Sequence, residues 1–204
     1  SLDGFVDKNI EMVFSTKETR GNLVKNPGFI IPVWINPLLC REPESRTIPQ
    51  VILISLDTVR PDHLSCYGYE RNTSPSVDSL AADGILFANT YSTSSWTLPA
   101  HVSLMTSLGC ARHTVYFPNQ QIPRGITTLA DILRSHGFYT AAFTGGGYLS
   151  SSFGFSKGFD SYHEIRLGGN QDKRFDEAER LSQTACSWIA RNKDKPFFLF
   201  LHTY

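Results

Sequence analysis

Two short groups of polar residues stand where catalysis could occur. The first begins at Asp57 and Thr58, directly after the apolar run 51–56, and continues to Asp62. A carboxylate that follows a buried strand is a hard oxygen ligand for a divalent cation, and open α/β sheets bind ligands beyond the carboxyl ends of their strands. The alternative interpretation is structural, with Asp57 capping a helix and Asp62 solvated. The spacing alone leaves both interpretations open.

The second group is the hydroxyl-rich segment SSWTLPAH at residues 94–101, which runs into a helix whose first turn is marked by Pro99. A helix N-terminus offers free N–H groups and the positive end of the helix dipole, and both favour a bound oxyanion. Thr97 would stand beside the central atom of such an anion. The alternative is a simple N-cap, a role that Thr often fills.

An alternation of strands and helices could bring these groups together. The apolar run 51–56 predicts a central strand, buried on both faces. Pro75 and Gly84 mark the start and end of a helix. Further strands are expected at 85–89, 138–143 and 197–201, and further helices at 99–105, 127–136 and 176–192. This order predicts an α/β fold with helices on both faces of one sheet.

Residues 1–48 have a different pattern. Short apolar runs separated by Gly, Asn and Pro predict strands and turns, and the charged stretch 41–49 with its two prolines predicts a linker. We therefore expect a β-rich segment and linker at 1–48, the end of an upstream module, and a separate α/β unit at 49–204. The first segment has no convergent polar groups, so no catalytic role is expected for it.

Composition excludes some classes of function. The 204 residues carry 19 Lys+Arg and 19 Asp+Glu, so no net charge attracts a nucleic acid. The longest apolar runs are far shorter than the roughly 20 residues that span a bilayer, so no transmembrane segment is expected. The four cysteines lie far apart without a C-x-x-C pair, which favours buried free thiols over disulfides.

Several motifs stand in the order of a known family. They include ISLDTVRPDHLSCYGY at 54–69, FANTYS at 87–92, WTLPAHVSLMTS at 96–107, TLADIL at 128–133, GFYTAAF at 137–143, FGF at 153–155 and GFD at 158–160. Residues 50–204 thereby resemble the N-terminal part of the sulfatase domain, in the alkaline phosphatase superfamily. The resemblance implies a mixed, mainly parallel sheet sandwiched by helices, with one divalent cation at its carboxyl edge.

The resemblance also implies site residues. Asp57 stands where the family has its first metal ligand, and Thr58 where it often has a second Asp. Thr97 occupies the nucleophile position of the C/S-x-P-x-R signature, and His101 occupies its Arg position. Typical members oxidise that Cys or Ser to formylglycine, which Thr cannot form, so no formylglycine is expected at Thr97. A Thr97 alkoxide could still attack sulfur or phosphorus.

Two further differences and two further candidates follow from the resemblance. The glycines at 145–147 replace the Lys and His that typical members carry there, and they favour a tight turn with close backbone approach over an anion-binding nest. His113 and His202 stand near positions from which relatives contact substrate. The family draws its remaining ligands from a later half, so the sequence is expected to be a truncated domain that is inactive alone.

Three functions remain open at this point. The first is hydrolysis of sulfate esters with Ca²⁺ or Mg²⁺, and the second is phosphoryl transfer or phosphodiester hydrolysis at Thr97, with Zn²⁺ or Mn²⁺. The third is a binding homologue without activity. The expected partner is a sulfated or phosphorylated small molecule or glycan, in a secreted or cell-envelope setting. The oligomeric state is not readable from the sequence.

Overall fold

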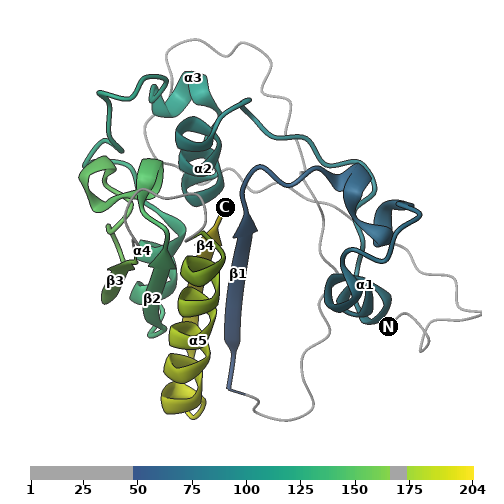
Figure 1. Ribbon diagram of the computed structural model, residues 1–204. Helices are drawn as coiled ribbons and strands as arrows, with labels where there is room; N and C mark the ends of the chain where they lie inside the picture. Colours follow the sequence, from purple (N-terminus) through teal and green to yellow (C-terminus); the bar gives the residue numbers. More distant parts are fainter. Residues whose placement is uncertain (1–47, 166–173) are drawn as a thin grey trace, which may run out of the picture. The chain divides into compact units, whose positions relative to one another are not determined.

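The computed structural model describes residues 48–165 and 174–204, with side chains of the second range from residue 177 onward. The β-rich segment expected at 1–48, and Cys40 within it, therefore lie outside the described residues apart from the last position. The described residues contain a parallel sheet with helices on both faces (Figure 1). This arrangement confirms the α/β fold class.

Four parallel strands form the sheet, in the order β1-β4-β2-β3. They are β1 (Gln50–Leu56), β2 (Tyr139–Thr144), β3 (Ser161–Glu164) and β4 (Phe197–Thr203). Because all the pairs are parallel, the carboxyl ends of the strands meet at one edge of the sheet. In the β1–β4 register Ser55 lies opposite His202, and Leu56 opposite Thr203.

The described residues contain the four helices expected from the sequence, in the expected order, and one short helix that was not predicted, α3. They are α1 (Pro75–Asp83), α2 (Thr97–Thr106), α3 (Cys110–His113), α4 (Leu129–Ser135) and α5 (Arg174–Asn192), with short 3-10 turns at Pro61–His63, Ser65–Tyr67, Gly147–Leu149 and Ser151–Phe153. The start of α4 is fixed by a capping box, in which Thr128 and Asp131 exchange hydrogen bonds between side chain and backbone. The helix predicted at 99–105 begins two residues earlier, at Thr97.

The core has two layers because alternate side chains of a strand point to opposite faces. On β4, Phe198 and Phe200 pack with residues of α2 and α4, among them Leu98 and Ala130. The intervening Phe197 and Leu199 pack with α5, which contributes Leu181, Ala185 and Trp188. The same alternation directs His202, two residues after Phe200, to the face covered by α2.

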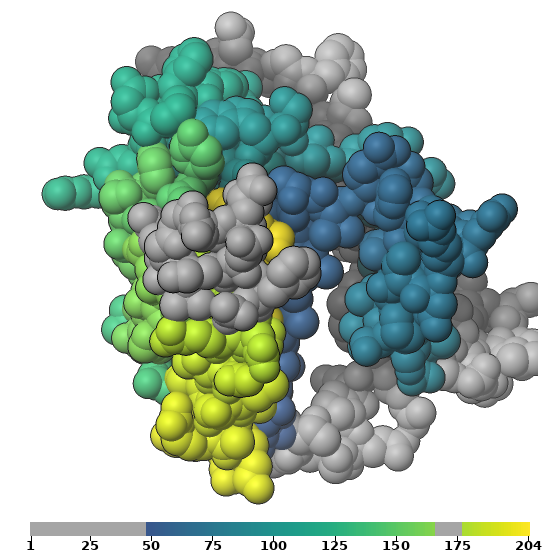
Figure 2. Space-filling view, in the orientation of Figure 1, coloured from purple at the N-terminus to yellow at the C-terminus, as the bar shows by residue number. Residues whose placement is uncertain are grey.

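Two strand predictions are wrong. β1 is the edge strand of the described sheet, not a central strand, and four of its apolar residues are exposed, namely Val51, Ile52, Ile54 and Leu56. Figure 2 shows atoms of this segment, in dark blue, at the surface of the molecule. Among the described residues, only Leu53 of β1 packs against a hydrophobic cluster, and no residue of β1 joins the layer that α5 covers. The run 85–89 forms no strand, and Ile85 is 73% exposed, because no described strand lies beside it to supply hydrogen bonds.

The cysteine prediction holds in part. Cys66, Cys110 and Cys186 are free thiols, as expected, but none is fully buried, and Cys186 on α5 is exposed. Within the residues that the structure describes, no helix combines the length and apolar character needed to cross a bilayer.

Candidate functional site

The candidate site lies at the carboxyl edge of the sheet, where β1 ends. On β1 the odd-numbered residues Leu53, Ser55 and Asp57 are partly buried, whereas their even-numbered neighbours are exposed. Leu53 packs against the α2 side of the core, so Ser55 and Asp57 face the same way. The Asp57 N–H donates to the Thr203 carbonyl at 2.9 Å, which holds Asp57 against β4.

Thr97 is the first residue of α2 and reaches Asp57 directly. Its hydroxyl donates a hydrogen bond of 2.7 Å to Asp57 Oδ2, slightly shorter than the separation of about 3 to 5 Å that one bridging cation with oxygen ligands requires. The N-cap of α2 is Trp96, and no side chain caps it. Thr97 is therefore not an N-cap. The Asp57 carboxylate accepts its hydrogen bond from the Thr97 side chain and does not cap a helix.

His101 lies one turn further along α2 and is only 7% exposed. Its Nδ1 lies 2.8 Å from the Thr97 carbonyl, which can only accept, so Nδ1 carries the proton. Nε2 is then the acceptor for the Ser55 hydroxyl at 2.8 Å. Burial lowers the pKa of His101, and the bond to the Thr97 carbonyl opposes that shift in part. His101 is therefore a neutral imidazole with a defined tautomer.

His202 is fully buried, and neither ring nitrogen has a hydrogen-bond partner in the part of the chain that the structure describes. Its Nε2 lies 3.5 Å from Asp57 Oδ2, and its ring stands edge-on to that of His101 with centroids 5.1 Å apart. Burial, and next the neighbouring His101, lower the pKa of His202 to about 4. His202 is thus neutral at pH 7, so its contact with Asp57 is not an ion pair at that pH.

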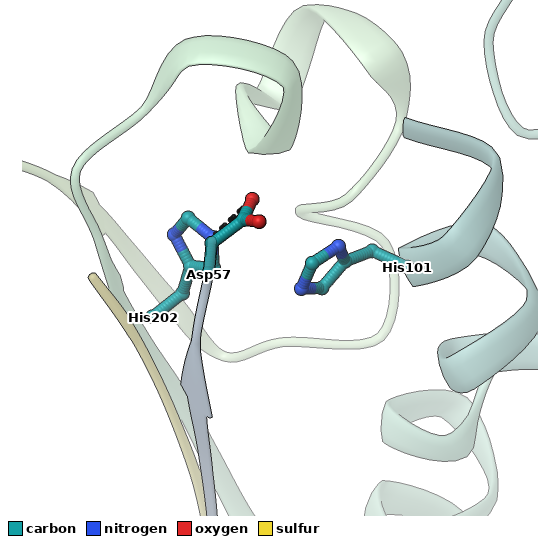
Figure 3. Close-up of side chains that lie close together, drawn as sticks. All are labelled: Asp57, His101 and His202. Atoms are coloured by element: carbon teal, nitrogen blue, oxygen red, sulfur yellow. Dashed lines mark ion pairs between the residues drawn. The ribbon is translucent and has the colours of Figure 1, made fainter. Parts of the chain in front are cut away.

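Asp57, His101 and His202 together fit a metal ion. One ligand atom from each residue can be chosen so that all three lie within 4.8 Å of one another (Figure 3). Figure 3 shows the Asp57 carboxylate beside the His202 ring, with the His101 ring facing both. A buried imidazole without a partner is costly unless a ligand satisfies it, and a cation bound here would do so.

The structure does not bring every predicted residue into this cluster. His113 is fully buried in the core, where its Nδ1 accepts from the Val115 N–H and its Nε2 donates to Ser103, each at 3.0 Å. Thr58 is exposed and has a left-handed backbone, with φ of 62°. Asp62 pairs with Arg60 at the surface, as the alternative interpretation of a solvated Asp62 expects.

The glycine loop after β2 makes close approaches on the same side of the sheet. A Cβ on Gly145 would lie 2.5 Å from Glu177 Oε1, and one on Gly147 would lie 2.6 Å from the Tyr204 hydroxyl. Gly147 also has φ of +60°, which other residues rarely adopt. These contacts confirm the interpretation of the glycines as a tight turn with close approach.

Ser55 is a site residue that the sequence analysis missed. It is the single polar residue of the apolar run 51–56, and because it precedes Asp57 by two residues, it shares the face of Asp57. That spacing was the signal that could have identified it. The sequence analysis also separated His101 and His202 into different roles, whereas the structure places them together beside Asp57.

Comparisons with known proteins agree with this description. The sulfatase family model matches residues 49–204. N-acetylgalactosamine-6-O-sulfatase of Bacteroides thetaiotaomicron is 33% identical over 97 residues, which are 45% of this chain and 19% of that protein. Arylsulfatase A of Homo sapiens is 31% identical over 98 residues, again 45% of this chain and 19% of that protein. The chain spans about a fifth of the length of these relatives.

The fold comparison gives the same result. A protein solved in complex with its substrate D-glucosamine-2-N,6-O-disulfate superposes with a TM-score of 0.64 at 21% identity, over 76% of this chain and 34% of that chain. At this identity the likeness concerns the fold. Because the family model covers the whole described α/β unit and more than half of the chain, this chain belongs to the sulfatase family of the alkaline phosphatase superfamily.

Proposed function

We propose that the protein is a metal-dependent hydrolase of sulfate esters in which Thr97 is the nucleophile. The 2.7 Å hydrogen bond from Thr97 to Asp57 carries this proposal, because a hydroxyl needs a proton acceptor before it can attack. The position of Thr97 at the start of helix α2 also supports the proposal. Thr97 opens the 10-residue helix α2, whose N-terminal dipole favours the anionic sulfate group.

The chain's own residues account for the first half of the reaction. Asp57 orients the Thr97 hydroxyl and accepts its proton, and the Thr97 oxygen forms a bond to sulfur as the bond from sulfur to the ester oxygen breaks. The departing ester oxygen takes up that proton and leaves as the alcohol. Water then attacks sulfur, the bond from sulfur to the Thr97 oxygen breaks, and one water proton restores the Thr97 hydroxyl as hydrogen sulfate is released. A bound cation would supply Lewis-acid stabilisation of the developing negative charge. Asp57, His101 and His202 are the residues that would hold it.

Phosphoryl transfer is the second candidate, and the identity of residue 97 favours it. Thr cannot be oxidised to formylglycine, so the route that typical sulfatases use to expel sulfate is closed here. An unmodified hydroxyl beside a carboxylate is equally suited to attack phosphorus. In this reading His101 and Thr97 keep their positions and only the preferred ester changes.

The decisive experiment compares sulfate and phosphate esters of one alcohol with the full-length protein. We expect the sulfate ester to be turned over faster, and Thr97→Ala to abolish turnover. Thr106→Ala, at the other end of α2, is the matched control and should leave turnover unchanged. A rate on the phosphate ester that is higher by several orders of magnitude would replace the first function by the second. Full activity of Thr97→Ala would remove the nucleophile assignment from both.

The proposed substrate is a sulfated small molecule or glycan. The name of one relative, an N-acetylgalactosamine-6-O-sulfatase, supports this class, as does the disulfated glucosamine bound to the solved structure. Because a sulfated glycan is too large to enter a cell unaided, we propose a secreted or cell-envelope location, which cell fractionation would test.

A further inference from the structure

We propose that Asp57, His101 and His202 form a transition-metal site that selects Zn²⁺ over Ca²⁺ and Mg²⁺. The proposal rests on the proposed function only in assigning the cation a use beside Thr97, and it is tested by binding alone. It differs from the expectation that Asp57 and Thr58 supply hard oxygen ligands to Ca²⁺ or Mg²⁺. It also assigns His101 and His202 to one shared role.

The kinds of ligand atom decide between the ions. The cluster offers one carboxylate oxygen and two imidazole nitrogens. Ca²⁺ takes about 6 to 8 oxygen ligands, and Mg²⁺ prefers oxygen ligands and its own water. Zn²⁺ binds imidazole and carboxylate together, and catalytic zinc sites commonly use three protein ligands with one open position. The two imidazoles of the described ligand set therefore favour Zn²⁺ over Ca²⁺ and Mg²⁺.

His101 is already prepared for this role. Its Nδ1 proton is held by the Thr97 carbonyl at 2.8 Å, so the lone pair lies on Nε2. A backbone carbonyl that fixes the second nitrogen is the usual support of a metal-binding histidine. In the structure the Ser55 hydroxyl donates to Nε2, and a metal ion would replace that bond. Ser55 is therefore not a ligand, and its hydrogen bond to Nε2 competes with the metal ion.

His202 supplies the independent observation. It is fully buried, and both ring nitrogens lack a hydrogen-bond partner among the described residues. Buried polar atoms are almost always paired, so a fully buried imidazole at a sheet edge indicates a ligand. The ring lies against the Asp57 carboxylate and the His101 ring, where a shared ion would satisfy it (Figure 3).

The spacing also suits zinc. Metal–ligand distances of about 2.0 to 2.1 Å in a tetrahedron place the ligand atoms about 3.3 Å apart. The distance from His202 Nε2 to Asp57 Oδ2 is 3.5 Å, close to this value. The widest gap in the cluster is at most 4.8 Å, so binding requires a modest closure of the rings. Thr97, bonded to Asp57 at 2.7 Å, stands next to the position left for substrate.

The first test measures binding to the full-length protein after it has been stripped by a chelator. Calorimetric titrations with Zn²⁺, Co²⁺, Mg²⁺ and Ca²⁺ should show one site at which Zn²⁺ and Co²⁺ bind at least about 100-fold more tightly than Mg²⁺ or Ca²⁺. The Co²⁺ form should have the intense visible absorption of a four-coordinate ion. Equal or tighter binding of Ca²⁺ or Mg²⁺ would overturn the proposal.

The second test assigns the ligands. His101→Gln and His202→Gln should each weaken Zn²⁺ binding by at least about 100-fold. His136→Gln, at an exposed histidine at the end of α4, is the control and should bind as the unchanged protein does. Unchanged Zn²⁺ affinity in either site variant would remove that residue from the site. X-ray absorption of the unchanged zinc protein should resolve two imidazole ligands. This measurement does not depend on the folding of any variant, and fewer than two imidazoles would overturn the proposal.

These measurements separate the inference from the proposed function. Tight Zn²⁺ binding without turnover of any sulfate or phosphate ester would contradict the function alone. Turnover that depends on Ca²⁺ or Mg²⁺, with no selective Zn²⁺ binding, would contradict the inference alone.

Discussion

Strands β1 and β4 lie side by side and each brings one residue to the site, yet they differ in their surroundings. β4 is almost completely buried, with α2 and α4 on one face and α5 on the other. β1 forms the edge of the described sheet and exposes most of its side chains. The site therefore joins a rigid core strand, which carries His202, to an edge strand, which carries Ser55 and leads into Asp57.

This difference assigns separate tasks to the two strands. The His202 side chain is held by packing, since neither ring nitrogen has a hydrogen-bond partner among the described residues. Asp57 is held by polar contacts, through its N–H to Thr203 and its carboxylate to Thr97. Changes in the apolar residues of β4 should therefore affect the stability of the fold, whereas changes at the end of β1 should affect the chemistry.

The largest effect is expected at Asp57. Asp57→Asn keeps the shape of the side chain but removes the charge that binds a cation and accepts the Thr97 proton. Turnover of the full-length protein should fall at least about 10³-fold, the scale seen when one member of a catalytic unit is lost. Zn²⁺ affinity should fall in the same variant, and thermal unfolding should change little. Retained turnover with lost metal binding would separate the two roles and contradict this account.

Phe200 tests the core strand. Phe200 is fully buried in β4 and packs on the α2 side of the sheet. Phe200→Ala should lower the free energy of unfolding by about 3 to 5 kcal/mol, because the lost burial is accompanied by a cavity. Urea unfolding of the full-length protein measures this loss. Phe117→Ala, at a residue 63% exposed, is the control and should cost far less. Equal losses in the two variants would show that the core assignment of β4 is wrong.

Much of the fold was predictable from local pattern. Apolar runs and helix-end residues located β1, β2, β4, α1 and α4, because each signal is contained in a few neighbouring residues. The approach of Thr97 to Asp57 also followed from local rules. One residue ends a parallel strand and the other starts a helix, and both positions fall at the carboxyl edge of the sheet.

The rest depends on contacts between distant segments. An apolar run predicts a strand, but its place in the sheet depends on which strands pair with it, so β1 was wrongly expected at the centre. The run 85–89 has the composition of a strand but has no pairing strand among residues 48–165 and 174–204. The meeting of His101 with His202 required the register that sets Ser55 opposite His202, and no single segment contains that information.

The hydrogen bond from Ser55 to His101 tests how β1 supports the site. In metal-free protein its hydroxyl donates to His101 Nε2 at 2.8 Å, so Ser55→Ala should reduce stability by about 1 kcal/mol. With zinc bound, Nε2 is already satisfied and the same variant should be nearly neutral. Because the variant loses about 1 kcal/mol only in the metal-free state, its Zn²⁺ binding should be tighter by about fivefold. Calorimetry and unfolding with and without Zn²⁺ measure both, and weaker Zn²⁺ binding would indicate that Ser55 supports the site in another way.

The smallest effect is expected at Ile54. Its side chain is 54% exposed on β1, so Ile54→Ala should lower the free energy of unfolding by less than about 1 kcal/mol. Leu199→Ala is the matched comparison on β4, because Leu199 is 1% exposed and a buried leucine typically costs about 2 to 5 kcal/mol when truncated. Urea unfolding of the two full-length variants gives the difference directly. If the loss at Ile54 equals that at Leu199, residues outside those described must cover this face of β1 in the full-length protein. In that case the contrast between an edge strand and a core strand would not hold for the whole molecule.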